Sequence, residues 1–158
     1  MRQLIFSVTI ITGMLVFAGC GGQNLPKDLP PLYRQSIIIT QEGKPFAGVS
    51  VVLHPIEESK WNAGSATDAN GTAEIRTHGL YRGVAAGKYK VTLGREEVES
   101  KSLGIRGTSE IFQDTYYSLV ELKYLDPETT PLEIEITKKN APVTFEIGPP
   151  VRVVIGTN

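Results

Sequence analysis

Residues 132–136 read Leu132-Glu133-Ile134-Glu135-Ile136, and this stretch decides the fold class of the chain. Apolar and acidic side chains alternate with a period of two, which is typical of a β-strand with one buried face and one face in water. Residues 88–93 and 143–147 show the same alternation. The apolar side chains expected in the core are Tyr89, Val91, Leu93, Leu132, Ile134, Ile136, Val143, Phe145 and Ile147.

Short apolar segments separated by turn signals extend this pattern along the chain. Further strands are expected at residues 36–40, 49–54, 72–77 and 151–155, and one is expected to end near Thr67. Asp68-Ala69-Asn70-Gly71 predicts a tight turn, because Gly adopts positive φ easily and Asp and Asn bond to nearby backbone. Seven or eight short strands of this kind predict an all-β chain folded as an antiparallel sandwich or barrel.

Two segments fall outside the strand pattern. Residues 96–117 match no motif and are expected to form an insertion or long loop, rich in Gly, Ser and charge. Residues 116–124 have room for a two-turn helix before Asp126-Pro127 would end it.

The N-terminus has the pattern of a secretory signal peptide. A basic start at Arg2 precedes an apolar run, residues 4–17, that is shorter than the about 20 residues of a membrane span. Small residues then lead to the single cysteine of the chain, in Ala18-Gly19-Cys20. This end resembles the bacterial lipobox, with Phe17 in place of the usual Leu.

The lipobox resemblance implies cleavage before Cys20 and attachment of lipid, palmitate included, to that residue. A lone cysteine in an exported chain has no partner for an internal disulfide, and lipidation accounts for it. The expected organisation is a signal peptide at 1–19, a lipidated Gly- and Pro-rich tether at 20–33 and a domain at 34–158. The protein is therefore expected in a bacterial cell envelope. An Asp directly after the cysteine would resemble an inner-membrane retention signal. Residue 21 is Gly, so the outer membrane is slightly favoured.

The charge balance argues against a nucleic-acid partner. Removing residues 1–19 leaves 15 of the 16 basic residues against 17 acidic ones. Such a near-neutral domain lacks the excess of basic residues that binding to nucleic acid requires.

Three motifs in order resemble the carboxypeptidase regulatory-like domains, which are relatives of the transthyretin (prealbumin) sandwich. They are Gly43-Lys44-Pro45-Phe46-Ala47-Gly48-Val49-Ser50-Val51, Thr67-Asp68-Ala69-Asn70-Gly71 and Ala86-Gly87-Lys88-Tyr89-Lys90-Val91. The resemblance covers residues 29–147 and implies an antiparallel Greek-key β-sandwich. Residues 123–132 also resemble an ending found in small bacterial lipoproteins built on this domain.

No catalytic or metal-binding motif stands out, so no enzyme activity and no cofactor are expected. His54 and His78 lie 24 residues apart, without Cys or carboxylate at metal-ligand spacing. Related hydroxyisourate hydrolases end in Tyr-Arg-Gly-Ser, whereas Tyr81-Arg82-Gly83-Val84 stands in mid-chain and is interpreted as a loop.

Four aromatic residues in expected loops are the candidates for ligand contact, because exposed rings stack on sugars or anchor protein partners. They are Trp61, Tyr81, Tyr116 and Tyr117. The favoured function is a non-catalytic envelope lipoprotein whose sandwich has a structural or protein-interaction role. A carbohydrate-binding module is the alternative, favoured if Trp61 forms a planar cluster with Tyr81 or Tyr117. A hydrolase is a distant third.

Overall fold

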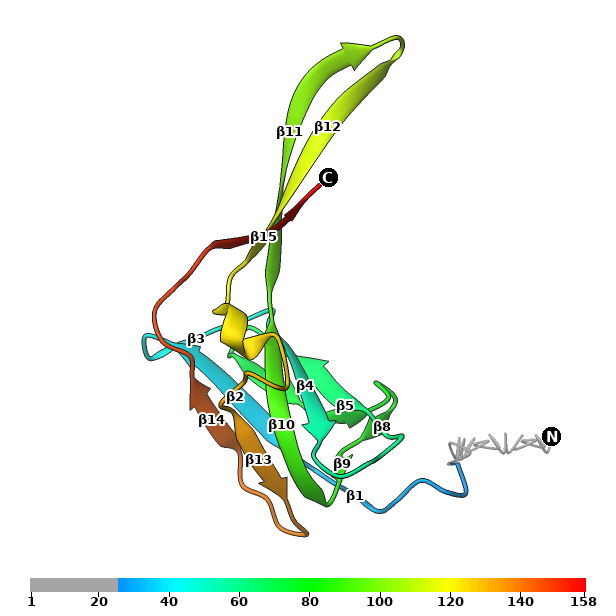
Figure 1. Cartoon of the computed structure of the whole chain (residues 1–158). Helices are drawn as coiled ribbons and strands as arrows, with labels where there is room; N and C mark the ends of the chain where they lie inside the picture. The colour runs from blue at the N-terminus through cyan, green and yellow to red at the C-terminus, as the bar shows by residue number, and fades with distance from the viewer. Residues whose placement is uncertain (1–25) are drawn as a thin grey trace, which may run out of the picture.

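The computed structural model describes residues 26–158, which form two β-sheets packed face to face and a long hairpin that extends from one end (Figure 1). In spatial order, the larger sheet contains β13 (Glu133–Ile136), β10 (Gly87–Gly94), β4 (Ser50–Pro55), β5 (Ala63–Ala66), β7 (Arg76–Thr77) and β8 (Tyr81–Arg82). The facing sheet contains β14 (Val143–Glu146), β2 (Ser36–Gln41), β3 (Lys44–Pro45) and β6 (Thr72–Glu74). The chain is therefore all-β, as predicted, and its arrangement is consistent with a β-sandwich.

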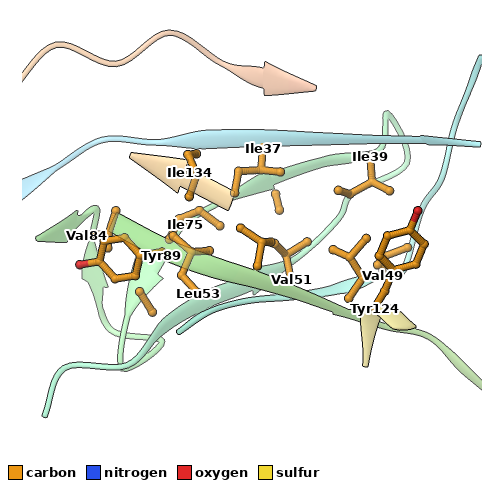
Figure 2. Packing of buried hydrophobic residues seen from close by; sticks show 14 of the residues in the cluster. Ile37, Ile39, Val49, Val51, Leu53, Ile75, Val84, Tyr89, Tyr124 and Ile134 are labelled. Carbon is orange, nitrogen blue, oxygen red and sulfur yellow. The ribbon is translucent and has the colours of Figure 1, made fainter. Parts of the chain in front are cut away.

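The core lies between these two sheets. Ile37 and Ile39 point from β2 toward Val49, Val51 and Leu53 (Figure 2), and all five side chains are almost fully buried. Along β2 and β4, every second residue points into this layer and is buried, so the core lies on one face of each sheet. Burial of several such side chains, each contributing about 1.5–3 kcal/mol, supplies the main favourable term in folding.

The register predicted for residues 132–136 is confirmed. Ile134 and Ile136 are buried, whereas Glu133 and Glu135 are exposed. Tyr89, Val91, Leu93 and Ile147 are also buried as predicted.

Full burial was a wrong prediction for Leu132, Val143 and Phe145, which are only partly buried. Val143 and Phe145 belong to β14, an outer strand of its sheet, and Leu132 directly precedes β13, the outer strand of the other. Side chains at a sheet edge have neighbours on one side only, so the alternation gives their direction but not the extent of their burial.

The turn at residues 68–71 is confirmed in detail. The Asp68 carboxylate accepts hydrogen bonds from the backbone N–H groups of Asn70 at 2.8 Å and Thr72 at 2.9 Å. Gly71 has φ of 71°. This turn takes the chain from β5 in the larger sheet to β6, which pairs with β2 in the other sheet. It is therefore a connection between the layers rather than a simple hairpin.

One pairing departs from the antiparallel expectation. Strands β14 and β2 pair in parallel, with Val143 opposite Ile37 and Glu146 opposite Thr40. Residues 26–158 divide into fifteen strand segments, several of only two residues, so the expected number of seven or eight is not confirmed.

Residues 96–117 are not a loop, and the two-turn helix expected within residues 116–124 is not formed. Residues 96–117 belong to two long strands, β11 (Glu96–Arg106) and β12 (Ser109–Ser118), which form a hairpin. Residues 116–118 complete β12, and the only helical element near Tyr124 is a single 3-10 turn, η1 (Leu122–Tyr124). No helix within residues 26–158 has the length and hydropathy of a membrane span.

Two short strands close the end of the sandwich opposite the hairpin. Strand β1 (Leu32–Tyr33), inside the segment expected to be tether, pairs with β9 (Val84–Ala85). Because β9 leads into the start of β10 and β11 continues from its end, β1 and the hairpin lie at opposite ends of the domain (Figure 1).

Candidate interaction surface on the hairpin arm

The hairpin of β11 and β12, called the arm below, is a direct continuation of the core. Only Arg95 separates the end of β10 from the start of β11. At the return of the chain, the Leu119 N–H donates to the Arg95 carbonyl at 2.8 Å, and the buried Ser118 hydroxyl donates to the Val120 carbonyl at 2.7 Å. These contacts fix the base of the arm to the sandwich.

The turn and a bulge shape the outer part of the arm. Gly107, with φ of 66°, and Thr108 form a two-residue loop between the paired residues Arg106 and Ser109. Gly at the first loop position is the preference of the type II′ turn, which is common in tight hairpins. The pairing register shifts between Ser102 and Gly104, which marks a β-bulge.

Every residue of β11 is exposed. Of the eleven large hydrophobic side chains exposed in the described part of the chain, seven belong to the sheet of β11, β12 and β15 (Val153–Thr157). Four of them gather near the tip of the arm, namely Leu103, Ile105, Ile111 and Phe112, and Ile105 is 78% exposed. Apolar side chains concentrated on one projecting element are typical of a binding surface.

The two faces of the arm differ in character. Paired residues of antiparallel strands share a face, so Val98 and Tyr116 lie on one face and Glu97 and Tyr117 on the other. On the Tyr117 face, the Arg152 guanidinium lies 3.4 Å from the centre of the Tyr117 ring.

Arg152 also links the arm to the C-terminal segment. It pairs with Glu99 at 2.7 Å and with Glu97 at 3.5 Å. The hydrogen bond and charge of Arg152 lower the pKa of the Glu99 carboxyl below its usual range. This exposed network holds the C-terminal segment against the charged face and leaves the Val98 face uncovered.

The arm has two open strand edges. The three-stranded sheet has the order β11-β12-β15, and β15 covers β12 only at residues 115–118. Within residues 26–158, no strand pairs with the other edge of β11 or with residues 109–113 of β12 on the β15 side, and the Asp114 carbonyl accepts a hydrogen bond from the Asn158 N–H at 3.1 Å. Unpaired N–H and C=O groups on such edges accept an added strand from another chain.

The aromatic candidates lie in two separate parts of the fold. Trp61 is in a loop, as predicted, with its ring 4.9 Å from that of His78. Tyr81, expected in a loop, lies in the short strand β8. Tyr116 and Tyr117, also expected in loops, are neighbours on β12 and therefore point to opposite faces. Trp61 thus lies between two strands of the larger sheet and Tyr81 lies in that sheet, whereas the two arm tyrosines belong to the sheet of β11, β12 and β15.

The two histidines make ordinary polar contacts. His54 Nε2 lies 2.8 Å from the Thr92 hydroxyl, and His78 Nε2 lies 3.2 Å from the Lys60 carbonyl. Among residues 26–158, no three His, Cys, Asp or Glu side chains are placed to hold a metal ion. Tyr81-Arg82-Gly83, interpreted as a loop, is a short strand followed by a close backbone contact. Cys20 lies outside the described residues, so its lipidation stays a prediction.

Comparison with known proteins gives no family for this chain. No family model matches, and no curated protein matches. Among solved structures, the chain is similar to a 9R-lipoxygenase from Cyanothece PCC8801, at 12% identity and a TM-score of 0.25. The similarity covers 75% of this chain but only 16% of the lipoxygenase, and a score of this size does not indicate a shared fold.

Proposed function

We propose that this chain is a non-catalytic lipoprotein of the bacterial cell envelope whose sandwich presents the arm to a protein partner. The lipid anchor is supported by the signal-like N-terminus and by Cys20, the single cysteine. The interaction role is supported by one observation above all: an eleven-residue strand, β11, that is exposed along its whole length and open at one edge.

A hairpin that projects into solvent in this way has low stability of its own. A two-stranded hairpin is at best marginally stable in water, because it buries little apolar surface. A partner strand added beside β11 would satisfy the open backbone groups and cover Val98 and the apolar tip. The occupant that we propose is therefore a strand of another envelope protein.

The fold assignment in this proposal is a transthyretin-like Greek-key sandwich of the carboxypeptidase regulatory-like type. It is supported by the positions of the three motifs. The first covers β3 and the start of β4, the second forms the turn before β6, and the third opens β10.

The carbohydrate-binding alternative has less support. The ring of Trp61, in a loop, packs with that of His78, whereas Tyr117 lies on β12 and has the Arg152 guanidinium stacked on its ring. A sugar platform requires rings that share one accessible surface.

The anchor is tested by Cys20→Ser. We expect the protein to leave the membrane fraction while the sandwich still folds, because residue 20 precedes the described domain. Lys139→Ser, an exposed change in a turn, serves as the control and should stay with the membrane. Recovery of the Cys20→Ser protein in the detergent-extracted membrane fraction would contradict the anchor.

The arm is tested by photo-cross-linking in intact envelopes. A photoreactive residue at Ile105 is compared with one at Leu80, which is 64% exposed on the sandwich. We expect a discrete product with a second protein from position 105 and none from position 80. For the substitutions, the photoreactive residue is placed at position 98 instead. Replacing Leu103, Ile105 and Phe112 by Ser should then abolish the cross-linked product. Replacing the exposed Ile56, Leu80 and Leu125 by Ser should leave it unchanged. A product of twice the chain mass, or no product, would overturn the proposed partner.

A further inference from the structure

Three arginines meet at a pocket beside β1, at the end of the sandwich opposite the arm. The pocket has a volume of about 260 Å³, and Arg34, Arg76 and Arg82 contribute to its lining. They come from three separate places in the chain: the residue after β1, the start of β7 and the end of β8. Their meeting is therefore a product of the fold and not of local sequence.

A close backbone contact holds these arginines together. Gly83, which follows Arg82, has φ of 102°, and a Cβ added to it would lie 2.7 Å from the carbonyl oxygen of Tyr33, the residue before Arg34. Gly83 also forms a β-bridge with Arg76. The backbones of the three arginines are thus fixed around one glycine, and all three residues line the same pocket.

The lining of this pocket has an excess of positive charge, three arginines against the single carboxylate of Glu74. None of the three arginines forms an ion pair within the described part of the chain. Glu74, the one carboxylate in the lining, accepts a hydrogen bond from the Ser36 hydroxyl at 2.7 Å. Guanidinium groups present donors in a planar fork that matches carboxylate and phosphate oxygens. An anion of this geometry is the ligand that the pocket suits.

A second, apolar pocket adjoins the first. It has a volume of about 480 Å³ and shares Arg82 with the arginine pocket. Leu29, Pro30, Leu32 and Tyr81 are among the residues that line it. The adjoining pockets therefore suit an amphiphile, with an anionic group on the arginines and an apolar part against the proline-rich segment.

The position of these pockets relates them to the membrane. Pro26, which lines the apolar pocket, lies six residues after Cys20. Six extended residues span at most about 20 Å. If Cys20 carries the lipid of the proposed function, the pockets lie within about that distance of the bilayer surface, where phospholipid head groups are the most abundant amphiphilic anions.

We infer that Arg34, Arg76 and Arg82, with the adjoining apolar pocket, bind an anionic phospholipid of the membrane that anchors the protein. The phosphate lies on the three guanidinium groups, and the first part of the acyl chains lies against Leu29 and Pro30. The lipid then fixes the end of the sandwich beside β1 toward the bilayer and directs the arm away from it. The inference rests on the anchor of the proposed function and not on the arm.

The test uses the lipidated full chain in a neutral detergent, so that binding is measured apart from membrane anchoring. Short-chain phosphatidylglycerol, short-chain phosphatidylcholine and inorganic phosphate are titrated separately, with thermal unfolding and native mass spectrometry as readouts. We expect phosphatidylglycerol to bind and to raise the unfolding temperature. Neither the zwitterionic lipid nor phosphate should match it, because one brings a choline cation to the arginines and the other leaves the apolar pocket empty.

Substitutions then locate the site. Replacing Arg34, Arg76 and Arg82 by Gln should weaken phosphatidylglycerol binding by about tenfold or more, as expected from the loss of charged hydrogen bonds. A matched control that replaces Lys101, Arg106 and Lys139 by Gln removes equal charge elsewhere and should bind as the parent does. Because Arg76 is half-buried, its substitution can affect folding, so a variant with only Arg34→Gln and Arg82→Gln is measured too. Thermal unfolding without ligand shows that each variant folds.

Three results would overturn the inference. Equal binding of phosphatidylglycerol and phosphatidylcholine would show that the anionic head group is not selected. Inorganic phosphate binding as tightly as phosphatidylglycerol would make this a site for a soluble phosphate. An equal loss of phosphatidylglycerol binding in the pocket variant and the control variant would show that binding depends only on net charge and not on this pocket. None of these results depends on the fate of Cys20→Ser, so the two proposals fail separately.

Discussion

The strands β10 and β11 are nearly one continuous strand, yet they have opposite surroundings. In β10, Tyr89, Val91 and Leu93 are buried between the two sheets, whereas every residue of β11 is exposed. The same extended backbone therefore forms part of the core in β10, where a second sheet faces it, and part of the exposed arm in β11, where none does. The sandwich is stabilised by packing, but the arm is stabilised by its hairpin ladder, by its base contacts and by the Arg152 network.

This difference predicts unequal stability along one strand. Segments with few buried apolar contacts open locally at a lower free energy than core strands do. We expect the amides of residues 98–113 to exchange with solvent well before those of β10 and β4.

The largest contrast is expected from equal truncations in the two regions. Ile39→Ala in β2 removes a side chain with no exposed area and should lower the free energy of unfolding by about 2–5 kcal/mol. Ile105→Ala removes a side chain that is 78% exposed and should change it by less than about 0.5 kcal/mol. Urea denaturation of both variants measures the difference. Similar losses at the two positions would show that the tip of the arm is covered within the molecule.

Phe145→Ala gives an intermediate case. Phe145 is only partly buried on the outer strand β14. Its truncation should therefore cost less than the about 3–5 kcal/mol of a fully buried Phe. A loss as large as that of a buried Phe, in the same urea experiment, would mean that a neighbouring segment covers β14.

A smaller contrast is expected at two glycines with nearly equal backbone angles. Gly71 and Gly107 have φ of 71° and 66°, but a Cβ on Gly71 would lie 2.6 Å from the Ile39 carbonyl oxygen, whereas a Cβ on Gly107 would meet nothing within 4 Å. Gly107→Ala should cost about 1–2 kcal/mol of backbone strain. Gly71→Ala should cost more, about 2–4 kcal/mol, because overpacking adds to the strain. Equal losses in thermal unfolding would mean that the backbone around Gly71 relaxes freely.

The smallest effect is expected at the base of the arm, where Arg152 lowers the pKa of Glu99. A lowered pKa means that the stabilisation is complete above the ordinary glutamate pKa of 4.5 and is lost as the pH falls through the lower pKa of the folded state. Carboxyl NMR of Glu99 should show a midpoint below 4.5 that returns to the ordinary range in Arg152→Gln. A midpoint that the substitution leaves unchanged would contradict the ion pair.

The sequence predicted the sandwich well because most of its strands have one buried face. Ile134 alternates with Glu133 and Glu135, and that alternation exists only because one side meets a core. The arm has no buried face, so Val98, Ser100 and Ser102 follow one another without an apolar period. The available signal was the turn at Gly107-Thr108, which marks a hairpin only once strands are assumed on both sides.

The sequence could not predict the pairing of β14 with β2 or the arginine pocket either. Val143 and Ile37 lie far apart in the sequence, and nothing in either segment states that they pair in parallel. Arg34, Arg76 and Arg82 likewise have no common spacing. Both features arise from the way in which distant segments meet, which a single sequence does not contain.

The continuity of β10 and β11 through Arg95 has a mechanical consequence. Force applied at Gly107 and directed away from β1 would run along the backbone into β10, which is paired with β4 on one side and β13 on the other (Figure 1). These ladders would be loaded in shear, so their hydrogen bonds would share the load and break together rather than one at a time. Single-molecule pulling between residues 26 and 107 should therefore give a higher rupture force than pulling across the outer pairing of β7 and β8. With one end held in a bilayer and the other by a partner, such a domain would act as a load-bearing link between them.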